Sequence, residues 1–243
     1  MNVYYRNKKA DLSSAEIATE TPLTNVYDPA LELRADFKSW KATIAGDFGG
    51  ITAIDSLCLG YTNAVKYRLT TREGECSGFI RNRIEAHNFE ETIFTDWFTL
   101  ELNPYAEWAD APEPGERENL YLGHLFLGMK TALPRFSPGP SAAIALASEA
   151  SRSFGGQVFG IKRTSLASFS AAFPMIAADE RRLIEEYVVA VQNVEPHIID
   201  PYPGARAEFP PMYAALDMGE LQMQKIDGDG FFWSCQLAWR EAR

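Results

Sequence analysis

Short apolar segments separated by turn-forming residues are the feature that most constrains the fold of this chain. From about Thr21 onward, glycine, asparagine, aspartate and proline repeatedly interrupt these segments. Residues 64–70 are the clearest case, because Val65, Tyr67 and Leu69 alternate with charged or hydroxyl-bearing side chains. Such alternation is typical of a strand with one buried face, and short strands between turns are typical of a sandwich or barrel. The sequence therefore predicts a mainly β protein.

Further strands are expected from the same signals. Residues 51–59 form a longer apolar segment, which is typical of a strand buried on both faces. Other strands are expected at 40–48, 92–102, 120–129, 157–173 (as one or two strands), 197–200, 220–226 and 231–240. The last two flank residues 227–230, Asp-Gly-Asp-Gly, which lack the later oxygen donors of a calcium loop. We therefore interpret them as the turn of a hairpin.

One helix is predicted, at residues 179–192. Asp179 is a suitable N-cap, and Glu180 is favourable at the positive end of the helix dipole. Apolar residues then recur at helical spacing on one face: Leu183, Ile184, Tyr187, Val188 and Val191. Asn193 and Pro196 are expected to end the helix.

Changes in composition predict four regions. Residues 1–20 are polar and are expected to be an N-terminal arm, and residues 21–135 a β-sandwich. Residues 136–156 are expected to be a linker or long loop, because Ser-Pro-Gly-Pro at 137–140 cannot continue a regular element. Residues 157–243 are expected to form a second β domain that contains the helix. Its proline-rich segment, 196–211, is expected to contact neighbouring subunits.

The charge balance is acidic. Lys and Arg number 23 against 33 Asp and Glu, a net charge of −10, and no basic block occurs. A surface that binds nucleic-acid phosphates or anionic lipid is therefore not expected. The acidity fits either an ordinary soluble surface or walls that repel DNA sliding past them. The N-terminus lacks the apolar segment of a signal peptide, and no apolar run of about 18 residues follows, so we expect no membrane insertion.

No set of residues predicts catalysis, a metal or a cofactor. His87, His124 and His197 lack partners at metal-ligand spacing, and no serine elbow or phosphate loop is present. The three cysteines, Cys58, Cys76 and Cys235, contain no CxxC pair and are expected to be free thiols in a reducing compartment. We expect no enzymatic activity. A glycosidase would need two carboxyl groups about 5–10 Å apart across a cleft, a distance that sequence does not give.

Tyr105 and Trp108 are the candidate glycan contacts. Both lie in a predicted loop beside Glu107 and Asp110. Aromatic rings stack on the apolar face of a sugar, and nearby carboxylates accept hydrogen bonds from its hydroxyls. In the alternative interpretation, Trp108 anchors the loop against the sandwich or another subunit.

Residues 40–129 resemble the galactose-binding, discoidin-like β-sandwich. The resemblance rests on Ile-Ala-Gly-Asp-Phe-Gly at 44–49, Ile-Asp-Ser-Leu-Cys-Leu-Gly at 54–60 and the Thr-Asn-Ala turn at 62–64 with the strand after it. In that family a strand carrying Phe-Gly leads to a buried strand, a tight turn and the next strand. No sugar-binding residues of the family are matched here.

The order of later motifs is similar to structural proteins at the tip of long phage tails. A closing strand with Gly123 and Gly128 is followed by residues 154–163, Phe-Gly-Gly-Gln-Val-Phe-Gly-Ile-Lys-Arg, where Phe159 replaces the tyrosine of many relatives. Residues 166–243 are similar to tail-tube and distal-tail domains. The resemblance implies a discoidin-like β-sandwich plus a second β-sandwich or barrel of tail-tube or distal-tail type flanked by one α-helix.

The function implied by this resemblance is structural. The protein would be part of the distal tail or baseplate hub of a phage, assembling in the host cytoplasm into a homo-oligomeric ring of the virion tail tip. The ring would connect the tail-tube protein with other baseplate and host-recognition proteins. DNA would pass through its lumen without specific binding. The alternative is a carbohydrate-binding module that recognises a host surface glycan.

Overall fold

The computed structural model describes residues 1–14, 21–28, 33–105, 118–138, 140–145, 149–152, 158–161, 166–204, 209–226 and 231–242. The chain divides into two compact units. The N-terminal unit comprises Asn2–Thr131 and Ile198–Met212, and the C-terminal unit comprises Ala132–His197 and Tyr213–Ala242 together with Met1. Strands dominate both units, which confirms the prediction of a mainly β protein.

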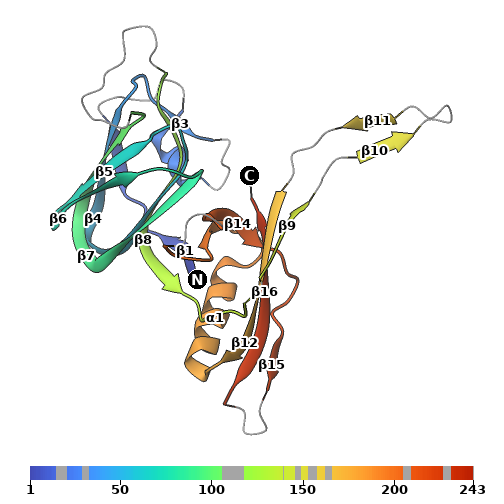
Figure 1. Cartoon of the computed structure of the whole chain (residues 1–243). Helices are drawn as coiled ribbons and strands as arrows, with labels where there is room; N and C mark the ends of the chain where they lie inside the picture. The colour runs from blue at the N-terminus through green and yellow to red at the C-terminus, as the bar shows by residue number, and fades with distance from the viewer. Residues whose placement is uncertain are drawn as a thin grey trace. The chain divides into compact units, whose positions relative to one another are not determined.

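The strands of the N-terminal unit follow the order β6-β5-β7-β4-β8-β1-β13, with β2 added to β4 and β3 to β8 (Figure 1). Every strand pair with a stated register in this unit is antiparallel. The strands are β1 (Asn2–Asn7), β2 (Asp11–Ser14), β3 (Ala35–Asp36), β4 (Ala42–Thr62), β5 (Lys66–Thr71), β6 (Gly74–Phe79), β7 (Ile84–Asn103), β8 (Tyr121–Ala132) and β13 (His197–Asp200), and a 3-10 helix, η1, spans Leu23–Tyr27.

Two long strands, β4 and β7, form the centre of this unit. They contain 21 and 20 residues and pair along most of their length. The strands predicted at 40–48 and 51–59 are therefore parts of one strand, interrupted by a register shift between Asp47 and Thr52. Gly49 lies within this irregularity at φ 71°, a conformation that favours glycine. Residues 54–60 are buried without interruption, as their apolar sequence predicts for a strand covered on both faces.

One apolar core fills the interior of the N-terminal unit. Leu57 and Leu59 of β4 and Leu125 and Leu127 of β8 belong to it. The residues between them in sequence, such as Ser56, Cys58 and Phe126, are buried too. Because neighbouring residues of a strand point to opposite faces, these alternate residues lie on the face turned away from that core.

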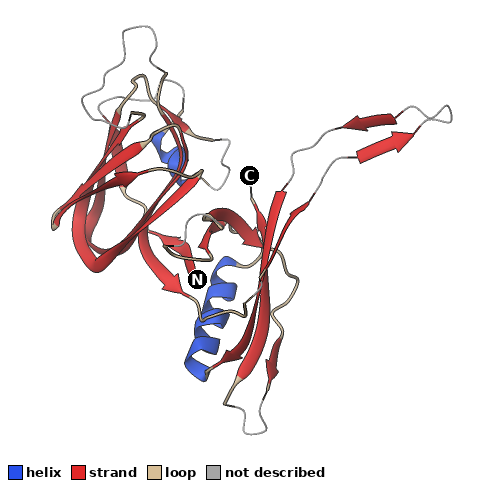
Figure 2. Cartoon of the chain, in the orientation of Figure 1, coloured by secondary structure: helices blue, strands red, loops and turns tan. Residues whose placement is uncertain are grey.

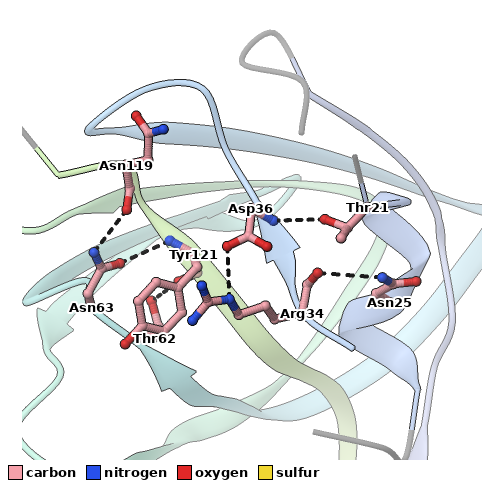
Figure 3. A network of polar contacts seen from close by, with 8 residues as sticks. All are labelled: Thr21, Asn25, Arg34, Asp36, Thr62, Asn63, Asn119 and Tyr121. Carbon is pink, nitrogen blue, oxygen red and sulfur yellow. Dashed lines mark hydrogen bonds and ion pairs between the residues drawn. The ribbon is translucent and has the colours of Figure 1, made fainter. Parts of the chain in front are cut away.

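The Thr-Asn-Ala turn after β4 fixes the start of β8 through side chains (Figure 3). Thr62 Oγ1 donates to the carbonyl of Tyr121 at 2.5 Å and accepts the N–H of Ala64 at 3.0 Å. Asn63 donates to the carbonyl of Asn119 at 3.1 Å and accepts the N–H of Tyr121 at 2.9 Å. The motif therefore has a structural role, because it satisfies backbone groups where two strands meet.

Arg34 completes this corner of the unit. Its guanidinium lies 4.1 Å from the ring centroid of Tyr121, and its Nε is 2.8 Å from Oδ1 of Asp36 (Figure 3). The ion pair is substantially exposed, so the stacking on Tyr121 accounts for more of its ordering than the charge does.

The C-terminal unit combines one α-helix with a second set of strands (Figure 2). Its main sheet has the order β14-β16-β12-β9, with β15 also paired to β16, while β10 and β11 pair with each other. The elements are β9 (Ser141–Ala145), β10 (Glu149–Arg152), β11 (Val158–Ile161), β12 (Leu166–Ile176), α1 (Ala178–Val191), β14 (Met212–Leu216), β15 (Met223–Lys225) and β16 (Trp233–Glu241). The predicted hairpin is confirmed by the β15–β16 pair, and its turn, 227–230, lies outside the described residues.

The helix begins earlier than the sequence predicts. Its N-cap is Ala177 instead of Asp179, because the carboxylate of Glu180 accepts the Ala177 N–H at 2.9 Å. This is the carboxylate half of a capping box. Ile184, Tyr187 and Val191 form the buried face, and Gln192 ends the helix at φ 48°. In the described part of the chain, no helix is long and apolar enough to cross a membrane.

The observed units differ from the predicted regions at two places. Residues 2–7, expected in a separate arm, form β1 and pair with β13, and Asp11–Ser14 pair with β4. Residues 198–212, expected in the second domain, belong to the N-terminal unit. The pairing of β1 with β13 joins segments nearly 200 residues apart, for which local composition carries no signal. The predicted linker, 136–156, includes β9 and β10.

Candidate functional site

A pocket in the N-terminal unit is the strongest candidate site among the described residues. Its volume is about 290 Å³. It lies between the start of β7 and the segment that follows β13, and we call it the β7–β13 pocket. Its lining residues are Asn82, Glu85, Ala86, His87, Asn88, Asp200, Tyr202, Pro203, Gly204, Phe209 and Pro211.

Prolines shape one wall of the pocket. Strand β13 ends at Asp200 and is followed directly by Pro201, and Pro203, Pro210 and Pro211 flank the two aromatic residues of this segment. A proline ring fixes φ near −65°, which restricts the conformations that the segment can adopt. Gly204 has a φ of 86°, as a tight turn with a glycine allows. Prolines and Gly204 therefore restrict the backbone of the described part of this wall.

Tyr202 and Phe209 form an aromatic pair in this wall. Their ring centroids are 5.3 Å apart and their planes are inclined by 38°. Tyr202 is half-buried, and Phe209 retains partial exposure as well. The pair therefore gives the pocket an apolar surface that a flat ligand face can cover.

Strand β7 supplies the opposite wall. The ring of His87 has edge contacts with Tyr67 at 6.0 Å and with Phe89 at 5.5 Å between centroids. His87 thus belongs to an aromatic row that continues into the core. No sequence pattern predicts a chemical role for His87, and its position follows from the pairing of β7 with β4.

A hydrogen-bond network lies behind the pocket and holds Asn88. The hydroxyl of Tyr4 donates to Oδ1 of Asn88 at 3.0 Å. The hydroxyl of Ser56 donates to Oδ1 of Asp55 at 2.7 Å and lies 3.2 Å from Oδ1 of Asn88. Ser56 and Tyr4 are almost completely buried, so the amide orientation of Asn88 is fixed from the interior.

Carboxylates dominate the electrostatics of this region. Burial raises the pKa of the Cys58 thiol well above its usual value, and the charges of Asp200, Glu85 and Asp55 raise it further. Asp55 accepts the backbone N–H of Lys130 at 2.7 Å, and its Oδ2 lies 3.5 Å from Lys130 Nζ. Glu85 accepts the backbone N–H of Arg81 at 3.3 Å. Among the described residues of the lining, Glu85 and Asp200 are acidic and none is a lysine or arginine; residues 205–208, between Gly204 and Phe209, lie outside the described part of the chain.

Of the two predicted glycan contacts, the structure describes Tyr105 alone. Trp108 is outside the described residues, as are Glu107 and Asp110. Tyr105 is half-buried, its ring centroid is 5.8 Å from that of Trp40, and its N–H donates to Asn103 Oδ1 at 2.9 Å. The structure does not bring Tyr105 to the β7–β13 pocket, whose lining excludes it. Tyr105 therefore stays a predicted glycan contact outside the β7–β13 pocket.

The remaining histidines and cysteines occupy structural positions. Burial lowers the pKa of His124 and of His197 to about 4, so both rings are neutral at pH 7. Cys58, Cys76 and Cys235 are free thiols. Within the described ranges, no three histidine, cysteine, aspartate or glutamate side chains are arranged to hold a metal ion.

Sequence reasoning missed the pocket because its two walls are far apart in the chain. Residues 82–88 and 200–211 come together through the strand order β7-β4-β8-β1-β13. The one local signal is the proline-rich segment 196–211, which the sequence analysis assigns to subunit contacts. Its aromatic residues, Tyr202 and Phe209, could have been included as candidates on that basis.

Comparisons with known proteins give similarity of structure alone. No protein-family model matches the chain, and no curated protein matches it. Over about half of its length the chain is similar to solved structures of carbohydrate-binding modules. A chitosan-binding module from a Paenibacillus sp. IK-5 chitosanase/glucanase matches 51% of this chain and 98% of the module, at 9% identity and a TM-score of 0.39.

Two further solved structures show the same extent of similarity. A family 32 carbohydrate-binding module from C. perfringens NanJ, in complex with galactose, matches 54% of this chain and 100% of the module, at 10% identity and a TM-score of 0.40. A Ruminococcus gnavus GH29 fucosidase in complex with fucose matches 52% of this chain and 26% of the enzyme, at 11% identity and a TM-score of 0.41.

Proposed function

We propose that the protein binds carbohydrate, and that the β7–β13 pocket holds one sugar ring. The observation that carries this proposal is the aromatic pair Tyr202 and Phe209 in one pocket with the polar residues Glu85, Asn88 and Asp200. A pyranose ring has an apolar C–H face and a rim of hydroxyls. The aromatic wall suits the face, and the oxygen acceptors suit the rim.

The size and rigidity of the pocket support a small ligand. At about 290 Å³ it lies at the lower end of the range for ligand pockets, which favours one ring over an enclosed oligosaccharide. The prolines on one side and the buried network behind Asn88 on the other hold the walls in place before binding. A preformed site loses less conformational entropy when the ligand binds.

A glycan array followed by titration of the best ligands tests this proposal. Tyr202→Ala and Phe209→Ala are expected to lower affinity about tenfold or more, since each removes a stacking surface. Phe231→Ala is the matched control, because Phe231 is 68% exposed and lies in the C-terminal unit. Tyr105→Ala and Trp108→Ala test the site predicted from sequence. Retained binding in the pocket variants with loss in Tyr105→Ala or Trp108→Ala would move the site to that loop.

We keep the tail-tip structural protein as the second candidate function, supported by an edge strand. Strand β9 ends the strand order of the C-terminal unit and pairs with β12. Its Ile144 is 70% exposed. An edge strand with an exposed apolar side chain favours pairing with another chain, as in a ring of identical subunits around a DNA channel. Sugar binding and ring assembly are compatible, because the pocket and β9 belong to different units.

Negative-stain imaging over a concentration series, with and without tail-tube protein from the same source, tests the second candidate. Rings that cap the tube support it. Ile144→Lys is expected to weaken assembly, whereas Val194→Lys, at a position 75% exposed outside the strands, should not. Dispersed monomers at every concentration would exclude the ring.

A further inference from the structure

We propose that a groove on the C-terminal sheet binds an extended, uncharged peptide segment of another protein. The groove has a volume of about 490 Å³ and is lined by residues of β12, β15, β16 and the segment before β15. These strands lie side by side in the order β15-β16-β12 (Figure 1). We call it the β12–β16 groove. It belongs to the C-terminal unit, so the proposal is separate from sugar binding in the β7–β13 pocket.

An interruption in strand pairing forms one side of the groove. Strands β14 and β15 both pair with β16, but this pairing stops at Leu216 and resumes at Met223. The residues between them, 217–222, face the shorter stretch 236–238 of β16, so they bulge away from that strand. Bulges redirect side chains and end regular pairing. Side chains of this bulge line the groove.

The strand register places the polar side chains of the groove on the face of the sheet turned away from α1. Trp239 of β16 donates a hydrogen bond to Tyr187 of α1, so its side chain points to the helix. Ser234 and Gln236 alternate with it and therefore lie on the opposite face. Gln224 pairs with Ser234 and shares that face. Both glutamines are exposed and Ser234 is half-buried, so all three can reach a ligand.

The described residues of the lining carry little charge. Glu220 is the one acidic residue among them, and none is basic. Nε2 of Gln222 donates to Oε1 of Glu220. Arg240, further along β16, is paired with Asp217, with 2.7 Å between its Nη2 and Oδ2 of the carboxylate. The groove therefore suits an uncharged ligand, because its amide and hydroxyl groups both donate and accept hydrogen bonds.

The spacing of these groups matches an extended peptide. Ser234 and Gln236 are two residues apart on β16, and Gln224 lies opposite Ser234. Two residues of a strand span roughly 7 Å. An extended peptide presents N–H and C=O groups to one side at the same two-residue repeat. A peptide lying along β16 would therefore meet a polar side chain at each repeat.

The described lining lacks the aromatic surface on which a sugar ring stacks. Phe173 is the one aromatic residue within it, and this residue is completely buried. Ala172 lies opposite Gln236, and Ala238 follows two residues later on the same face. Their small side chains allow a peptide main chain to approach the sheet closely. These features favour a peptide over a glycan in this groove.

The experiment compares peptides of equal length that differ in charge. Capped peptides of alternating serine and glutamine, serine and glutamate, and serine and lysine are titrated into the intact protein, with maltohexaose as a neutral sugar. NMR follows the side-chain amide signals of Gln222, Gln224 and Gln236. The serine–glutamine peptide is expected to shift these signals and to bind at least about fivefold tighter than either charged peptide.

Two variants assign the binding to the groove. Gln222→Ala and Gln236→Ala should each weaken binding of the serine–glutamine peptide about threefold or more, since each removes an amide. Asn193→Ala is the matched control, because Asn193 is an exposed amide residue of the same unit outside the groove lining. Thermal unfolding checks that each variant is folded, and the comparison of ligands on the unaltered protein needs no variant.

The outcomes decide the class of ligand. If the serine–glutamine peptide leaves the three glutamine signals unchanged, the inference is wrong. Shifts caused by maltohexaose and not by the peptide would make the groove a sugar site and overturn the peptide assignment. Charged peptides that bind as tightly as the neutral one would overturn the preference for an uncharged segment. None of these results bears on the β7–β13 pocket, which Tyr202→Ala tests.

Discussion

The hydroxyl of Tyr187 lies 2.5 Å from Nε2 of His197 in the interior of the C-terminal unit. His197 Nδ1 lies 3.0 Å from the carbonyl oxygen of Glu195, which only accepts, so Nδ1 carries the proton and Nε2 accepts from Tyr187. Nε1 of Trp239 donates to the Tyr187 oxygen at 2.8 Å. This chain of hydrogen bonds connects α1 and β16 with His197, the first residue of β13 and the one that belongs to the C-terminal unit.

Tyr187→Phe is expected to destabilise the protein by about 1–3 kcal/mol, because it leaves buried polar atoms of His197 and Trp239 without a partner. Urea unfolding followed by tryptophan fluorescence measures the change. Tyr121→Phe is the control, because it preserves the ring on which Arg34 stacks, and it should change stability by less than about 0.5 kcal/mol. Equal stability of Tyr187→Phe and the parent protein would show that the hydroxyl contributes nothing net.

Stability should fall as the pH drops from about 6.5 towards 4. Burial lowers the pKa of His124 and His197 from 6.5 to about 4 in the folded protein. Between these values the unfolded chain binds protons that the folded protein does not, so each histidine favours unfolding increasingly as pH decreases. Relative to its value at low pH, the free energy of unfolding therefore gains about 3 kcal/mol from each histidine above about pH 6.5. This contribution is lost as the pH falls towards 4.

Urea midpoints measured at several pH values check this dependence. Carboxylates titrate in the lower part of the same window, so the comparison uses variants: His124→Asn and His197→Asn should each reduce the slope of stability against pH by about one proton near pH 5.5. The two rings lie in different units, so both units should show the effect. A slope that is the same in the variants and the parent protein would contradict the burial argument.

Gly128→Ala should destabilise the N-terminal unit by about 1–3 kcal/mol, since overpacking has this cost in a close-packed interior. A Cβ at Gly128 would lie 2.5 Å from the carbonyl oxygen of Arg6 in β1, and backbone cannot move aside as a flexible side chain can. Gly60→Ala is the matched control on β4, where the nearest atoms would be at 3.4 and 3.5 Å, ordinary contacts. Equal melting temperatures for the two variants would show that β1 yields without cost.

Local sequence patterns predicted individual strands and the helix, whereas the β7–β13 pocket depends on pairing between strands that are distant in sequence. The alternation of Tyr67 and Leu69 with polar residues predicted β5, and the spacing of Ile184, Tyr187 and Val191 predicted α1 to within one residue. The sequence predicts two strands, at 40–48 and 51–59, where the structure has the single strand β4, because the same residues mark a turn and a bulge. The pocket joins residues 85 and 202, whose proximity depends on strand pairing that no local pattern encodes.

The three cysteines should react slowly in the folded protein and rapidly once their unit unfolds. Burial raises the pKa of Cys76 and Cys235 to about 11, which reduces the thiolate at a given pH about 100-fold relative to a thiol of pKa 9. Cys58 is completely buried and should react last, whereas Cys76 is only half-buried.

Pulse labelling with a maleimide at pH 8 along a urea gradient, read by mass spectrometry, measures the reaction rate of each cysteine. Cys235 reports on the C-terminal unit and Cys58 on the N-terminal unit. If Cys58 reacts in the absence of urea as fast as Cys76, the buried residues around Cys58 open in the native protein. The β7–β13 pocket is then not preformed.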